Sequence, residues 1–279
     1  MNQISEAKAK EKQSLMEVSL INASIFTPIL KKSRKADETI LGGIKNSNKL
    51  VFLDGKPSTT ALSALVYFLS KLPKLENGKI DRIKLDKNGI SFKYAELCKV
   101  LRIKNTTIAR KGLFEELYRL GRIIYKYDDL KVTRDEKGKH VSTVLKAGID
   151  HLFAIDFYGK KFDKSKKIAW TNKIYFHKTI LDSLENDGYR FIPTQRFLEL
   201  ELPTAKLISN LLAGHNQTRF WEIGLTKLAI HISVSTKTER RTKQTIKTAS
   251  EELKKQSLIK DFEFRKNEEG ETIIKYIFR

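Results

Sequence analysis

The chain has 279 residues, 40% of them hydrophobic, and a formal net charge of +21. At roughly 150 residues per domain this length predicts one or two domains with buried cores. The positive excess favours a polyanionic partner, either nucleic acid or an anionic membrane surface. The alternative is a lysine-rich soluble protein from an AT-rich genome. The longest apolar stretch, ALSALVYFL, is far shorter than the ~20 residues of a spanning helix.

The cysteine content and the first residues bear on the compartment. Cys98 is the only cysteine, so no disulfide can form within the chain. Its place in the apolar pattern of YAELCKVL predicts a small core residue. The beginning, MNQISEAKAKEKQSLMEV, is charged and lacks the apolar segment of a secretory signal. We therefore expect a cytoplasmic protein that makes no contact with a membrane.

A polar, lysine-rich segment over residues 1–38 is expected to be partly helical and partly disordered. A first domain is predicted over 39–160, and periodicity and turn residues indicate its elements. In chain order these are a strand at 49–55, a helix at 58–72, a hairpin around Asn88-Gly89, helices at 93–101 and 106–120, a strand at 122–127, and a strand–turn–strand unit at 128–145 with its charged turn at 136–139.

A second domain, predicted over 161–279, repeats the same order of elements. A helix at 203–214 is followed by a short strand and helix in WEIGLTKLAIHIS, a helix from Thr236 to about Lys255, and a hairpin with its tip at 266–270. Helix, strand, helix, helix, hairpin is the order of a winged helix. The predicted fold class is therefore α+β, with two tandem winged-helix domains.

The last helix of the second domain begins with unusually many cations and threonines. Thr236 and Glu239 have capping-box spacing. Spacing of 100° per residue places Ile246, Ala249 and Leu253 on one stripe, with the polar side chains opposite. Arginine and glutamine can pair with guanine and adenine edges, and threonine can touch phosphate or a thymine methyl. The candidate DNA-binding residues are Thr238, Arg240, Arg241, Lys243, Gln244, Lys247 and Thr248 in the helix, and Arg265, Lys266 and Asn267 in the following hairpin. The alternative is a solvated lysine-rich face.

The corresponding helix of the first domain is less clearly a base reader. Its beginning is cationic, but Glu115 and Glu116 follow, which predicts an exposed face of mixed charge. Backbone contact with DNA and a role in packing or dimerisation remain equally open. The apolar strand in KLVFL also suggests a protein contact. The candidate DNA-binding residues are Lys104, Asn105, Thr106, Thr107, Arg110 and Lys111 in and before the helix, and Arg134, Lys137 and Lys139 in the strand–turn–strand unit.

Sequence signals for catalysis are weak. The five histidines form no H-x-H or H-x-x-x-H pair, and there is no cysteine cluster, so no metal site is predicted. The phosphate-binding pattern G-x-x-x-x-G-K-[ST] does not occur, which disfavours a nucleotide-hydrolysing motor. A tyrosine nucleophile for strand cleavage would usually need a metal held by paired histidines. We therefore predict no cofactor and no enzymatic activity, with an origin-nicking enzyme as the less favoured alternative.

The chain resembles a known family over roughly residues 45–279. FWEIGLTKLAIHISVST followed by RRTKQTIKTASEELKKQSLI is similar to the final helix-turn-helix of that family. TNKIYFHKTILDSLENDGYRFIPTQRFLELELPTAKLISNLLAG is similar to the segment that joins the two winged helices in plasmid replication initiators of the replication initiator A type, which are similar to TrfA. Ile208-Ser209 stands where that family usually has Leu-Tyr, and Ile232-Ser233 stands where a glycine is common. The matching positions are Leu184, Gly188, Tyr189, Phe197, Leu198, Leu200, Pro203, Ala205, Lys206, Leu207 and Leu211.

The resemblance implies a function that charge and spacing do not. Such proteins bind repeated sites at a plasmid origin, help to melt an adjacent AT-rich segment, and recruit the host replication initiator and helicase. They often repress their own promoter as dimers, so a monomer–homodimer equilibrium is expected. A transcriptional regulator built from the same two domains is the main alternative.

Overall fold

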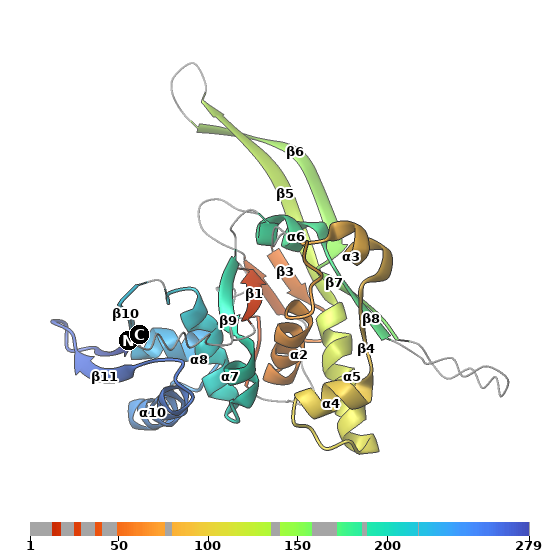
Figure 1. Ribbon diagram of the computed structural model, residues 1–279. Helices are drawn as coiled ribbons and strands as arrows, with labels where there is room; N and C mark the ends of the chain where they lie inside the picture. Colours follow the sequence, from red (N-terminus) through yellow and green to blue (C-terminus); the bar gives the residue numbers. More distant parts are fainter. Residues whose placement is uncertain are drawn as a thin grey trace, which may run out of the picture.

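The computed structural model describes residues 13–17, 25–28, 37–40, 49–75, 80–134, 140–157, 172–185, 189–216 and 218–278. Its elements form two winged helices, side by side, with further strands between and above them (Figure 1). Among the described helices, none has the length and apolar character needed to cross a membrane.

The first winged helix combines three helices with a three-stranded antiparallel sheet. Its strands lie in the spatial order β4-β8-β7, so the first strand in the chain pairs with the last. Apolar residues of the helices face the sheet, and Cys98 is fully buried, as predicted. The elements are α2 (Thr59–Leu69), β4 (Ile90–Phe92), α4 (Tyr94–Val100), α5 (Thr107–Gly121), β7 (Phe153–Asp156) and β8 (Asn172–Phe176).

The second winged helix has the same topology. Its sheet order, β10-β12-β11, again places the first strand beside the last. This repeated order confirms the prediction of two tandem winged helices. The elements are α8 (Pro203–Ala213), β10 (Phe220–Gly224), α9 (Leu225–His231), α10 (Glu239–Lys255), β11 (Asp261–Lys266) and β12 (Thr272–Ile277).

A second sheet adjoins the first winged helix. It has the order β2-β3-β5-β6, formed by β2 (Asp37–Ile40), β3 (Lys49–Phe52), β5 (Ile123–Arg134) and β6 (His140–His151). β3 pairs with only the first four residues of β5, so the rest of the β5–β6 hairpin projects as a two-stranded ribbon (Figure 1). The sequence correctly predicted this hairpin but wrongly took it for the wing. It is inserted between α5 and β7, and β7 and β8 are the wing strands.

The segment around Asn88-Gly89 also differs from its prediction. It is not a hairpin: Arg82–Asn88 form helix α3, followed directly by β4. The Asp81 carboxylate accepts a hydrogen bond from the backbone N–H of Lys84 at 3.0 Å and caps the helix. Gly89 ends it with a φ of 57°, and a Cβ there would lie 2.9 Å from the carbonyl oxygen of Ile174. Asn-Gly thus serves as a helix C-terminus rather than a turn.

Residues before position 38 contribute to the fold as well. β1 (Gln13–Glu17) pairs antiparallel with β9 (Tyr189–Pro193). Ile25 and Phe26 are buried in the core, and the backbone N–H of Thr27 donates to the carbonyl of Pro57 at 3.0 Å. The polar segment expected from composition therefore includes a strand and two core residues.

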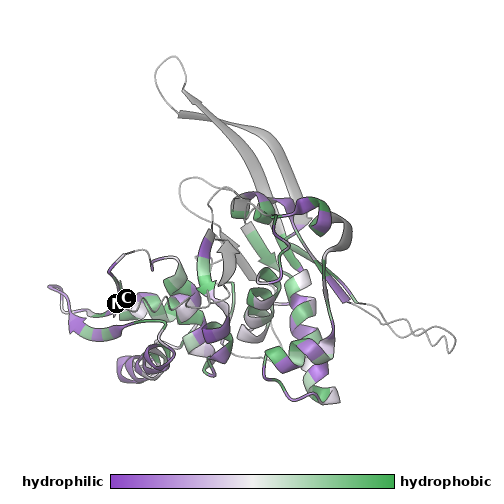
Figure 2. Ribbon diagram, in the orientation of Figure 1, coloured by the Kyte–Doolittle hydropathy of each residue, from purple (hydrophilic) through white to green (hydrophobic). Residues whose placement is uncertain are grey.

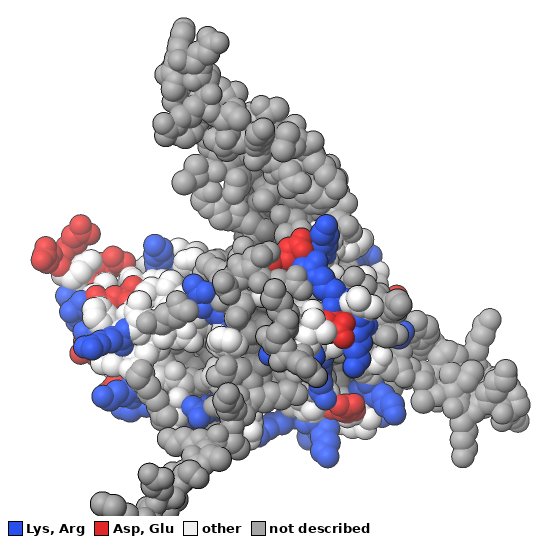
Figure 3. Space-filling view, turned by 45° about the horizontal axis from the view of Figure 1, so that its top comes forward, with Lys and Arg blue, Asp and Glu red and all other residues white. Residues whose placement is uncertain are grey.

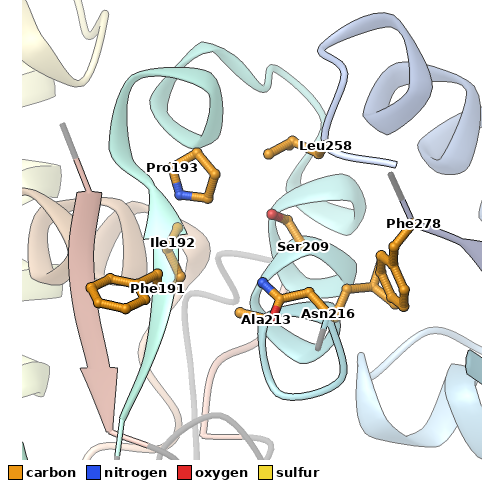
Figure 4. Close-up of a pocket in the computed structure, with 9 residues that line it drawn as sticks. Phe191, Ile192, Pro193, Ser209, Ala213, Asn216, Leu258 and Phe278 are labelled. Atoms are coloured by element: carbon orange, nitrogen blue, oxygen red, sulfur yellow. The ribbon is translucent and has the colours of Figure 1, made fainter. Parts of the chain in front are cut away.

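The connection between the winged helices consists of α6 (Lys178–Glu185), β9 and α7 (Thr194–Glu199). β8 lies beyond the predicted domain boundary at 160/161 but pairs with β4 and β7, so strands from both sides of that boundary share one sheet. A cavity of about 50 Å³ lies where β9 meets α8 (Figure 4). That volume suits one or two waters rather than a cofactor.

Hydropathy separates the interior from the outward helix faces (Figure 2). Hydrophobic residues line α2 and α8, whereas α10 is hydrophilic along most of its length. α10 is therefore held by a narrow apolar stripe, and most of its side chains remain available for a partner.

Candidate nucleic-acid interface

The two helix-turn-helix units share one turn geometry. After α9, Ser233 has a φ of 54°, and the backbone N–H of Val234 donates to the carbonyl of Ala229 at 2.8 Å. After α4, Arg102 has a φ of 55°, and Ile103 donates to Cys98 at the same distance. Ile232-Ser233 stands where a glycine is common, yet Ser233 adopts the left-handed conformation of the turn that orients the last helix.

The start of α10 is held by contacts that differ from the predicted capping box. The helix is capped at Thr238, not Thr236, and no side-chain hydrogen bond closes the cap. The Glu239 carboxylate instead accepts from the hydroxyl of Thr272 in β12 at 2.6 Å. The buried Thr242 hydroxyl donates to the carbonyl of Ser235 at 2.8 Å. These bonds fix the helix start against its wing and the preceding turn.

The two faces of α10 agree with the prediction. Ile246, Ala249 and Leu253 are fully buried. The buried Ser250 hydroxyl lies 3.1 Å from the Tyr276 hydroxyl, which anchors the same stripe to β12. The helix exposes Arg240, Arg241, Lys243, Gln244, Lys247 and Thr248, and Thr238 is exposed at its cap.

Contacts within the chain already orient several of these exposed side chains. The Lys243 ammonium lies 5.0 Å from the ring centroid of Phe264 in the wing. The Gln244 amide nitrogen donates to the Thr248 hydroxyl at 3.4 Å, and Lys247 lies 3.8 Å from the Glu251 carboxylate. Arg240 and Gln244, one turn apart, thus lie near the helix start, where a recognition helix meets base edges.

The wing of the second domain offers less than its sequence suggested. Arg265 forms an ion pair with Glu222 at 2.5 Å, and the Asn267 side-chain oxygen accepts from the backbone N–H of Glu271 at 2.8 Å. Lys266 is exposed. Figure 3 shows acidic side chains at the end of this wing, where Glu268 and Glu269 are exposed. Glu268 and Glu269 would repel phosphate, which leaves Lys266 as the candidate contact in this wing. The basic face of α10 is therefore the stronger candidate for a DNA surface.

In the first domain, the start of α5 presents the predicted polar residues. The Thr106 hydroxyl accepts from the backbone N–H of Ala109 at 3.3 Å and caps the helix. The Arg110 guanidinium donates to the Asn105 amide oxygen at 2.6 Å. Lys104, Thr107 and Lys111 are exposed beside them. Six predicted side chains therefore come together at one end of α5.

The exposed face of α5 differs from the predicted face of mixed charge at Glu116. Glu116 is not exposed: only 1% of it is accessible. Its carboxylate accepts from the backbone N–H of Ser58 at 2.5 Å and from Arg119 at 2.6 Å, tying α5 to the start of α2. Glu115 remains exposed, together with the apolar Ile108, Phe114 and Tyr118, whose exposure was not predicted. Placing Glu116 within the apolar i, i+3, i+4, i+7 pattern would have indicated its burial.

The remaining first-domain expectations concern β3 and the β5–β6 hairpin. Arg134 ends β5, where its backbone pairs with His140, while Lys137 and Lys139 lie outside the described residues. In KLVFL, Leu50 and Phe52 are buried and Leu53 is exposed, and β3 is paired along both edges by β2 and β5. The suggested protein contact through this strand stays a prediction.

Two titratable histidines lie near the second domain's core. Burial, then the charge of Arg190, lowers the pKa of His215, which stacks on Trp221 with ring centroids 4.2 Å apart. Burial, then Lys227, lowers the pKa of His231. Among the residues described here, no three histidine, cysteine or acidic side chains gather into a candidate metal site.

Comparison with known proteins finds similarity of fold only. No family model matches the sequence, and no curated protein matches it. Two crystal structures of domains 2 and 3 of RctB do match. One has a TM-score of 0.57 at 10% identity and covers 93% of this chain and 96% of that one. A selenomethionine derivative has a TM-score of 0.55 at 10% identity and covers 90% and 94%. The chain therefore shares the tandem winged-helix fold of RctB domains 2 and 3.

Proposed function

We propose that this protein is a DNA replication initiator that binds double-stranded DNA with its two winged helices. The observation that carries the proposal is the exposed face of α10. There, arginine, lysine and glutamine side chains crowd the start of the second helix of a helix-turn-helix unit. Such a helix enters the major groove with its N-terminal residues on base edges. The net charge of +21 supplies the attraction to phosphate.

The similarity of fold is one line of support for the initiator role. RctB is a replication initiator of Vibrio chromosome II. At 10% identity the comparison supports the shared architecture, and the resemblance of residues 171–214 to plasmid initiators is a separate line of support. Fold alone does not determine function, so DNA binding is argued from the α10 face.

In its finer form, the proposal assigns the protein to a plasmid origin in the cytoplasm. It would bind repeated sites there and at its own promoter, help to melt adjacent DNA, and recruit the host replication initiator and helicase. The second domain would supply sequence-specific contacts, and the first would supply backbone and dimer contacts within a monomer–homodimer equilibrium. The protein would act by binding energy and DNA deformation rather than by catalysis.

Footprinting the purified protein on the DNA that flanks its own gene tests this proposal. Repeated protected sites, together with replication of a small plasmid carrying them, would support an initiator. A single protected palindrome without replication would instead indicate a transcriptional regulator. A covalent tyrosine–DNA adduct on a supercoiled origin would replace the proposal with an origin-nicking enzyme.

A further inference from the structure

The solvent face of α5 has two features that packing within the chain does not explain. Ile108, in the first turn, is 85% exposed. Gly112 lies one turn later, and a Cβ built on it would meet no atom of another element within 4 Å. Glycine is a poor helix former, and here neither a turn nor a close internal neighbour requires it. By contrast, a Cβ at Gly121 would lie 3.6 Å from Ile155.

Ile108 and Gly112 are adjacent on the helix surface because residues four apart share one stripe. The surface around them is cationic and polar: Lys104, Lys111 and Thr107 are all exposed. Glu115 continues the stripe one turn farther on, where phosphate would be repelled. The contact surface therefore lies at the start of α5, where a recognition helix meets the groove.

We propose that Ile108 and Gly112 form a close-approach surface on which the first winged helix reads thymine methyl groups in the major groove. Gly112 removes the side chain that would hold the helix backbone away from the DNA. Ile108 then supplies an apolar contact for the C5-methyl group, the feature that distinguishes thymine in this groove. The surrounding cations select a polyanion over a second protein surface.

This inference rests on the proposed function and makes it more specific. The first domain would recognise sequence as well as backbone, with a preference for A·T pairs. At the corresponding place in the second domain, α10 presents Arg241 and Thr245, both exposed. The two domains would therefore read different base chemistry within one site.

The test begins with a duplex selected from a random library by the full-length protein. Each thymine is then replaced in turn by deoxyuridine, which lacks only the C5-methyl group. We expect affinity to fall about fourfold at one group of positions, the loss for one buried methyl group. Ile108→Ala should abolish that difference there and leave the other thymines unaffected. Ile83→Ala, at a 73% exposed isoleucine in α3, is the matched control and should bind as wild type does.

The variant Gly112→Ala distinguishes an effect on DNA binding from an effect on folding stability, because the two are expected to change in opposite directions. Alanine should raise the melting temperature by about 2–4 °C. The same change should weaken binding to the selected duplex roughly fivefold or more, because the added methyl group overpacks a close contact. Stronger folding with weaker binding would support the proposal.

Three results would overturn it. A selected duplex that shows no response to deoxyuridine refutes methyl reading while leaving the proposed function standing. Unchanged DNA affinity in Gly112→Ala, with a changed oligomeric state, would assign the surface to a second copy of the chain. If no duplex is enriched, the proposed function itself fails, and the inference fails with it.

Discussion

The last helices of the two winged helices share a buried pattern but differ in what they present to solvent. Aligned on buried positions, Leu113, Glu116, Leu117 and Leu120 of α5 correspond to Ile246, Ala249, Ser250 and Leu253 of α10. On the outer face, α10 has mainly cations, threonines and one amide, whereas α5 combines cations with Ile108, Phe114 and Tyr118. The comparison shows that one scaffold can carry two surfaces, because the core constrains only one stripe of each helix.

The largest effect should come from the last shared core position. Leu120→Ala and Leu253→Ala each remove a fully buried side chain and should destabilise the protein by about 2–5 kcal/mol. Equal losses in denaturant unfolding would show that the two stripes are equivalent. A loss below about 1 kcal/mol in one domain would break the equivalence.

Among the four aligned buried positions, α5 and α10 differ in charge at one, where α5 has Glu116 and α10 has Ala249. Glu116→Ala leaves the backbone N–H of Ser58 and the Arg119 guanidinium without their acceptor and should cost about 3 kcal/mol. Glu116→Gln keeps the shape and one acceptor, and should cost less. Unfolding curves for the two variants measure this ranking, and equal losses would contradict the role of the carboxylate.

The outward face of α10 should yield two classes of variant. Arg240→Ala and Gln244→Ala should relax the preference at one or two base pairs, worth about 1–3 kcal/mol each. Lys247→Ala and Lys266→Ala should weaken all sequences alike and reduce the slope of log affinity against log salt by about 1. Binding to a site library at two salt concentrations separates the classes. Wild-type behaviour in all four would mean that this face is merely solvated.

The shared left-handed turn should respond equally in both domains. Ser233→Gly and Arg102→Gly relieve a positive φ and should each stabilise the protein by about 1 kcal/mol. Thermal melts measure the gain, and Ser235→Gly, outside the left-handed position, is a control that should give none. A gain in one domain alone would show that the turns are not equivalent.

The smallest effect expected is a response to pH in the second domain. Folding lowers the pKa of His215 and His231, so the unfolded chain binds more protons as the pH falls below the ordinary value of 6.5. Stability should therefore decline below about pH 6.5, and His215→Gln should flatten the decline. Melts across this range test the sign, and a gain in stability on acidification would contradict it.

Helix periodicity made most of the second domain predictable. The buried stripe of α10 and the β11–β12 hairpin follow from local patterns, whereas the first domain depends on contacts between distant residues. Asn88-Gly89 does not form the predicted hairpin turn because Asp81, seven residues earlier, caps a helix that ends at Asn88. The polar composition of the N-terminal segment likewise gave no sign of Ile25 and Phe26, whose burial depends on elements formed much later in the chain.

The candidate site was predicted in part for the same reason. The exposed cations of α10 could be identified from helical spacing, because they lie opposite an apolar stripe. The ion pair of Arg265 with Glu222 could not, because β10 and β11 are far apart in sequence. Pairing between strands, not composition, determines which charges of the wing remain available.

The pairing of β1 with β9 has a consequence for synthesis on the ribosome. β1 emerges early, but its partner follows roughly 175 residues later. At about 5–20 residues per second, that interval lasts on the order of ten seconds or more. Throughout it, β1 lacks its partner strand, and Ile25 and Phe26 lack the later residues that bury them. The nascent chain should therefore depend on chaperones during this interval, because an unpaired strand can associate with other chains.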